Sequence, residues 1–106
     1  MAKYMVKAAY TAEGTRGLVK HGGTARVTSV TKAVEKMGGK VEAFHFAYGP
    51  ADAIIIVDVP NETAALALSL AVNASGAVTL EMVPLISAQQ VDEAAKLSVG
   101  YVPPGA

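Results

Sequence analysis

The segment Ala53–Val59 constrains the fold more than any other part of the chain. Residues 54–57 are three isoleucines and a valine, so an extended conformation points apolar side chains to both sides. Residues 49–52 have the composition of a turn, and Pro60 ends the apolar run. A strand that is apolar on both faces needs cover on both faces. The sequence therefore predicts a central strand in a sheet with two covered sides.

Hydrophobic periodicity on either side of this strand predicts alternating strands and helices. The predicted elements, in chain order, are strand Lys3–Tyr10, a short helical turn at Thr15–His21, helix Thr24–Met37, strand Lys40–Tyr48, strand Ala53–Val59, helix Glu62 to about Ser75, strand Ala77–Ile86 and a short helix from the capping-box residue Ser87 to about Leu97. The order β-α-β-β-α-β with a C-terminal helix indicates a ferredoxin-like α+β fold.

The same order predicts self-association. Right-handed crossovers place both long helices on one face of the sheet. The other face then has no cover within the chain except the short last helix, although the central strand is apolar there too. A second copy of the sheet is the economical cover, which predicts an isologous dimer that forms a dimeric α/β barrel. We expect one domain at residues 1–99, followed by a Pro/Gly-rich tail at 100–106 that lies along a neighbouring subunit.

Composition excludes several classes of protein. The chain of 106 residues has no cysteine, which excludes disulfides, thiolate catalysis and cysteine-based zinc sites. No apolar run approaches ~18 residues, and the N-terminus lacks the apolar core of a signal peptide, so we expect a cytoplasmic protein without a membrane span. A net charge of zero argues against nucleic-acid binding.

The charges are unevenly distributed along the chain. Residues 1–40 hold eight Lys or Arg and two acids, whereas residues 41–106 hold one Lys and seven acids. Two interpretations remain open. The two halves neutralise each other in the folded chain, or the N-terminal half builds a site for an anion.

Four segments together resemble the GYD-domain family of small bacterial proteins over essentially the whole chain. These segments are 14–26 (GTRGLVKHGGTAR), 38–44 (GGKVEAF), 68–76 (LSLAVNASG) and 91–95 (VDEAA). The resemblance implies a ferredoxin-like, dimeric α/β barrel fold. It implies no function, because the family has none assigned. The wider barrel superfamily includes cofactor-independent monooxygenases and haem-handling enzymes, an analogy at the level of fold only.

The motif that names the family, Gly-x-Tyr-Asp, falls at residues 49–52. Gly49 and Asp52 match this motif, but Ala51 stands where the tyrosine is expected. A role that depends on that phenol is therefore not carried over to this chain.

Strand alternation predicts one candidate site. If the aromatic faces of the first two strands meet the helices, then Lys3, Lys7, His45 and Glu81 point to the opposite side, toward a barrel interior or dimer interface. One interpretation is an ion-pair network such as Lys7 with Glu81. The other is a small pocket walled by Lys7 and His45, where the imidazole acts as a general base because it exchanges protons near neutral pH.

The glycine pair Gly22-Gly23 predicts a second candidate site. It precedes the first long helix and is flanked by Lys20 and Arg26, so exposed amides and two cations would attract a phosphate or carboxylate. The alternative is a flexible turn at the barrel end, with Arg26 paired to an acid such as Asp52. The candidate ligand-binding residues are thus Lys7, Lys20, Arg26, His45 and Asp52.

Other chemistries lack support in the sequence. The possible metal ligands His21, His45, Asp52 and Asp58 lack the spacing of a known site, so we predict no metal and no cofactor. No Gly-x-Ser-x-Gly elbow is present, and no catalytic residue is assigned. The four tyrosines are expected to be core or interface rings: Tyr4, Tyr10, Tyr48 and Tyr101.

Three functional hypotheses follow. The first is a homo-oligomeric module that binds a small anionic or aromatic molecule. The second is a cofactor-independent oxygenase or isomerase, with His45 as base and Lys7 or Arg26 stabilising an oxyanion. The third is a purely structural assembly protein.

Overall fold

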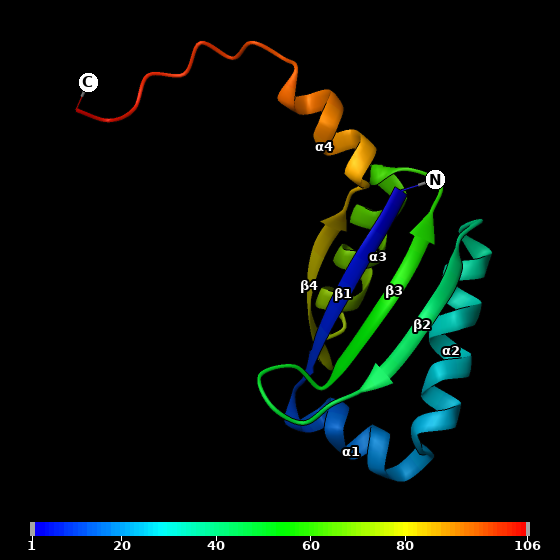
Figure 1. Ribbon diagram of the computed structural model, residues 1–106. Helices are drawn as coiled ribbons and strands as arrows, with labels where there is room; N and C mark the ends of the chain where they lie inside the picture. Colours follow the sequence, from blue (N-terminus) through cyan, green and yellow to red (C-terminus); the bar gives the residue numbers. More distant parts are fainter. Residues whose placement is uncertain (1, 106) are drawn as a thin grey trace.

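The computed structural model describes residues 2–105 and has a ferredoxin-like α+β fold (Figure 1). Its elements are β1 (Ala2–Tyr10), α1 (Ala12–His21), α2 (Gly23–Lys36), β2 (Lys40–Phe46), β3 (Ala53–Val59), α3 (Glu62–Ala74), β4 (Val78–Leu85) and α4 (Ala88–Ala95). This order confirms the predicted fold class. One difference is α1, a helix of 10 residues where the sequence predicted only a short turn at 15–21.

The sheet is antiparallel and has the strand order β2-β3-β1-β4. β3 and β1 are the central strands, as the two-sided apolar pattern of β3 predicts. β2 and β4 are the outer strands, so each leaves one row of backbone groups without a strand partner among the described residues.

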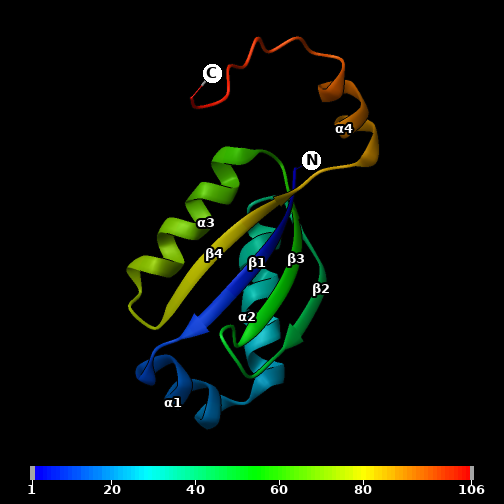
Figure 2. The ribbon, with the colours of Figure 1, turned by 60° about the vertical axis from the view of Figure 1, so that its left-hand side comes forward.

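Helices α2 and α3 cover the same face of the sheet, as predicted from crossover handedness (Figures 1 and 2). The core lies between these layers. Along β3 every second side chain from Ala53 to Val59 is buried against the helices, and the three between them are half-buried. The buried residues of the main core cluster are Val6, Val34, Ile55, Val57, Val59 and Ala65.

The other face, which we call the open face, carries no helix. Its side chains follow from the strand register, since directly opposed residues point to the same side. A central row is apolar and two flanking rows contain charges. The central row is Ala43, Ile56, Met5 and Val83; the flanking rows are His45, Ile54, Lys7 and Glu81 on one side, and Lys40, Asp58, Lys3 and Leu85 on the other.

Helix α1 begins where the end of β1 meets the start of β4. The Thr11 side chain caps the helix by accepting a hydrogen bond from the Gly14 N–H at 3.3 Å. The Thr11 backbone N–H donates to the Ala77 carbonyl at 3.0 Å. Gly14 has no side chain to obstruct this approach, because a Cβ there would overlap the Ala77 carbonyl oxygen. The close packing of α1 on the Ala77 carbonyl therefore requires a glycine at position 14, although this position is inside a helix.

Helix α4 and the following residues 96–105 form an arm that projects away from the sheet (Figures 1 and 2). The predicted capping box is present, because Ser87 accepts from the Gln90 N–H and Gln90 accepts from the Ser87 N–H. Several apolar side chains of this arm are exposed: Val91, Leu97, Val99, Tyr101 and Val102. Within the described chain no helix has both the length and the apolarity to cross a membrane.

Candidate functional site

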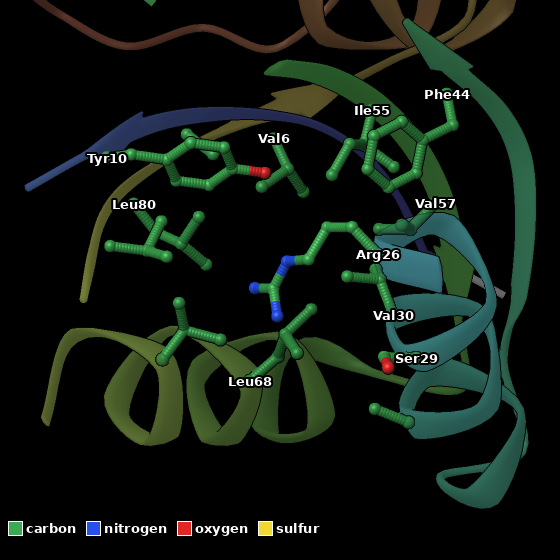
Figure 3. Close-up of a pocket in the computed structure, with 14 residues that line it drawn as sticks. Val6, Tyr10, Arg26, Ser29, Val30, Phe44, Ile55, Val57, Leu68 and Leu80 are labelled. Carbon is green, nitrogen blue, oxygen red and sulfur yellow. The ribbon is translucent and has the colours of Figure 1, made fainter. Parts of the chain in front are cut away.

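A cavity of about 180 Å³ lies between the sheet and helices α2 and α3 (Figure 3). Its walls are mainly aliphatic and come from all four strands and both helices. The apolar lining residues are Val6, Ala8, Val30, Ala33, Phe44, Ile55, Val57, Leu68, Val72, Val78 and Leu80. A pocket with such walls suits an apolar body with few polar groups.

Three side chains bring polar atoms to this cavity: Tyr10 from β1, and Arg26 and Ser29 from α2. Figure 3 shows the Arg26 guanidinium and the Tyr10 hydroxyl directed into the same space from opposite sides. Arg26 is half-buried, and among residues 2–105 it forms no ion pair and no side-chain hydrogen bond. The cavity thus presents a cation with free donors beside an apolar wall.

A wider groove of about 750 Å³ adjoins this cavity and is bordered by α1, α2 and α3. Tyr10, Arg26 and Ser29 line both spaces. Glu13 and His21 of α1 line only the groove. The groove therefore gives access to the cavity from the α1 side.

Lys7 and His45 lie on the open face, as strand alternation predicts. Both share a row with Ile54, and Lys7 stands directly opposite Glu81 on β4. Within the described residues the one ion pair is instead between Lys3 Nζ and Glu42 Oε2 at 3.1 Å, so the predicted Lys7–Glu81 pair is not formed. The role of His45 as a general base stays a prediction.

Strand β2 contains a bulge, but its position leaves the predicted sides of Phe44 and His45 unchanged. The register shifts between Val41 and Ala43, which precede the two aromatic residues of the strand, Phe44 and Phe46. Phe44 therefore still points to the helices and His45 to the open face.

Asp52 has a structural contact that the sequence did not predict. Its Oδ2 accepts a hydrogen bond from the Tyr10 backbone N–H at 2.8 Å, and its own N–H donates to the Ala8 carbonyl at 2.8 Å. Arg26 lies in the cavity instead, so the predicted alternative of an Arg26–Asp52 ion pair is wrong for the described chain. Asp52 fixes the end of β1, from which the Tyr10 ring reaches the cavity.

We expect Asp52→Ala to lower the free energy of unfolding by about 1.5 kcal/mol, because the part-buried Tyr10 N–H loses a charged acceptor. Urea denaturation followed by circular dichroism measures this change. Asp52→Asn is the control, since its amide oxygen can accept the same hydrogen bond. Equal unfolding curves for Asp52→Ala and the wild type would contradict the structural role.

The two glycines of the predicted anion cradle lie at the junction of α1 and α2. Gly22 has φ +86° and closes α1, and its N–H donates to the Leu18 carbonyl at 2.8 Å. Lys20 is exposed in the last turn of α1, where a cation is favoured by the helix dipole. Lys20 and Arg26 thus occupy different helices, and only Arg26 lines the cavity.

The five sequence-predicted residues are therefore not brought into one site. Lys7 and His45 share the open face, Arg26 lies on the opposite side of the sheet, Lys20 is exposed and Asp52 holds the end of β1. The sequence predicts Tyr10 as a core or interface ring able to hydrogen-bond a ligand, and it does not predict that Ser29 lines a cavity. The position of Arg26 was predictable from helical spacing. It lies four residues before Val30 and seven before Ala33, so all three belong to the same face of α2, and all three line the cavity.

The remaining candidates are dispersed. Among residues 2–105 no three His, Cys, Asp or Glu side chains gather as metal ligands. Tyr4 and Tyr10 are half-buried beside the core, as predicted. Tyr48 is 99% exposed and Tyr101 72% exposed, so within one chain they are not core rings.

Comparison with protein families finds a match to the GYD domain over residues 4–95. Comparisons with curated proteins and with solved structures find no match. The match runs from within β1 to the end of α4, and so includes all the residues that line the cavity and most of the open face.

Proposed function

Since this chain belongs to the GYD-domain family, whose match covers residues 4–95, we propose that it is a homodimeric module that binds a small molecule. The observation that carries the proposal is the cavity between the sheet and helices α2 and α3. The dimer holds the sheets together through their open faces, which leaves this cavity on the outer, helix-covered side of each sheet.

The cavity supports binding because its polar groups are few and convergent. Small-molecule sites are usually apolar pockets with a few polar side chains that point into the pocket. Here the walls are aliphatic, and the Arg26 guanidinium and Tyr10 hydroxyl point into the space (Figure 3). The adjoining groove supplies a route for entry without opening the sheet.

The open face supports pairing with a second copy. Its central apolar row contains Met5, Ile56 and Val83, and no helix of the described chain covers it. In a dimer two such rows bury each other, and the outer strands of one sheet lie beside those of the partner. The free edges of β2 and β4 then gain protection that the single chain lacks.

Charges on the open face favour one arrangement of the two sheets. A twofold axis parallel to the strands, between β1 and β3, brings β1 opposite the partner's β3 and β4 opposite its β2. Lys3 then faces Asp58 of the partner subunit, and Glu81 faces the partner's His45. The Asp58 carboxylate, whose Oδ1 has no hydrogen-bond partner within the described chain, then lies opposite a lysine that within its own chain pairs with Glu42. This complementarity supports a second copy as the occupant of the open face.

Native mass spectrometry of gently purified protein tests both parts of the proposal. We expect a dimer, or a multiple of dimers, with a reproducible extra mass that disappears after denaturation and refolding. A monomer would contradict the pairing of open faces. A dimer that never retains a small molecule, even after incubation with a metabolite extract, would contradict the binding function and favour a purely structural assembly.

A further inference from the structure

We infer that the cavity between the sheet and helices α2 and α3 selects a monocarboxylate with a benzene-sized apolar body, held by Arg26 and Tyr10. This inference rests on the proposed binding function and adds the chemical class of the ligand. The family match specifies no ligand class, and the sequence pattern indicates only a small anionic or aromatic molecule.

The volume of the cavity sets the size of the ligand. The space is about 180 Å³. An apolar cavity of about 150 Å³ in a protein interior holds one benzene molecule. The remaining space matches a single small substituent such as a carboxylate. A bicyclic or long-chain ligand would have to extend into the adjoining groove.

The chemistry of the walls sets the character of the ligand body. Eleven of the fourteen lining residues are aliphatic or aromatic hydrocarbons, so a ligand with several polar groups would leave those groups without partners. Phe44 is the aromatic ring of this wall, and it lies beside Ile55 and Val57 in Figure 3. A ring edge or face against Phe44 gains more than aliphatic contact alone.

Arg26 sets the charge of the ligand. The cavity lining contains this cation and no carboxylate, so an anion is favoured and a cation is excluded. The guanidinium is planar and its donors match the two oxygens of a carboxylate. Within residues 2–105 no acid pairs with it, and Asp52, the expected partner, is engaged by the Tyr10 N–H. A ligand carboxylate would supply the missing counter-charge.

Tyr10 completes the recognition of the carboxylate. Its hydroxyl enters the cavity from β1, and the Arg26 guanidinium enters it from α2 (Figure 3). A phenol donates one hydrogen bond, so the two side chains together provide donors from two directions. Glu13 borders the groove but not the cavity, and its negative charge disfavours an anion that remains outside.

Two probes of nearly equal shape test the inference: benzoate and its neutral analogue benzamide. Each is titrated into the ¹⁵N-labelled wild-type protein, and the Kd is taken from amide shifts along α2 and β4. We expect both probes to shift residues that line the cavity, and benzoate to bind at least about tenfold more tightly, because it alone forms a charge-assisted pair with Arg26. This comparison needs no variant and so does not depend on a variant folding.

Variants then assign the preference to a residue. We expect Arg26→Met to raise the Kd of benzoate by about tenfold or more and to leave that of benzamide within about twofold. Lys32→Met is the control, because Lys32 is an exposed cation on the same helix that does not line the cavity. A Lys32→Met protein should bind both probes as the wild type does.

The outcomes separate this inference from the proposed function. Equal binding of benzoate and benzamide would overturn the carboxylate class and leave a small-molecule cavity standing. A similar loss of benzoate binding in Arg26→Met and Lys32→Met would indicate general electrostatic attraction and also overturn it. If neither probe shifts the cavity residues while native mass spectrometry still detects a retained compound, the ligand class is wrong and the binding function survives.

Discussion

Replacing Ile56 by lysine is expected to convert the proposed dimer into a monomer. Ile56 lies on β3 in the middle of the apolar row of the open face, beside Met5 of β1. In the proposed dimer its side chain is buried against the partner's sheet, and burying an ammonium there removes it from water. Analytical ultracentrifugation across a concentration series measures the change.

The expected effect is large because the twofold axis repeats it. A substitution at the centre of an interface costs about 2 kcal/mol or more, and two copies raise the dimer Kd by roughly a thousandfold. The folded protomer should persist, since Ile56 points away from the core between β3 and the helices. Circular dichroism of the variant checks that persistence.

Leu66→Lys is the matched control for Ile56→Lys. Leu66 is also an apolar side chain, 56% exposed, but it lies on α3 rather than on the open face. Its replacement should leave the dimer intact. If Leu66→Lys dissociates the protein and Ile56→Lys does not, the outer surface of α3 is the interface and the pairing of open faces is wrong.

The open face was predictable from sequence because it depends on alternation alone. Period-two patterns place Lys7 and His45 on one side of their strands, and the structure confirms that side. What alternation does not give is the distance between charges on neighbouring strands. Lys7 and Glu81 are opposed in register, yet the ion pair forms between Lys3 and Glu42. A long, flexible lysine side chain can reach an acid that is not directly opposite it in the register, so the register alone does not determine the ion pair.

The cavity was not predicted from sequence for a different physical reason. A void forms where side chains of separate elements fail to fill the space between them. The total volume of those side chains cannot be derived from the pattern of any one segment. The sequence analysis assigned Arg26 to the glycine pair beside it because both features are local. Its actual surroundings come from strands and a helix far along the chain, such as Leu80 and Leu68.

Helix α1 shows how a glycine-rich segment can mislead. Because glycine is unfavourable within a helix, the four glycines at 14, 17, 22 and 23 predict only a short helical turn at 15–21. The structure has Gly14 and Gly17 inside α1. Only the first has a packing reason, namely its approach to the Ala77 carbonyl. The two glycines therefore make opposite predictions for the same substitution.

Gly14→Ala is expected to lower the free energy of unfolding by about 2–3 kcal/mol, because the added methyl group overlaps backbone that cannot rotate away. The Ala77 carbonyl carbon would lie 3.0 Å from the new Cβ. Moving it breaks the hydrogen bond at 3.0 Å from the Thr11 N–H, which joins the start of α1 to β4. Thermal and urea denaturation measure the loss.

Gly17→Ala supplies the comparison within the same helix. A Cβ at Gly17 meets no atom within 4 Å, so only the helix propensity changes and the free energy of unfolding should rise by about 0.5–1 kcal/mol. Opposite signs for the two substitutions would establish that α1 is a helix and that it packs on β4 through Gly14. Stabilisation by both would mean that α1 does not approach Ala77. Because α1 borders the groove that leads to Arg26, that result would also move one wall of the route into the cavity.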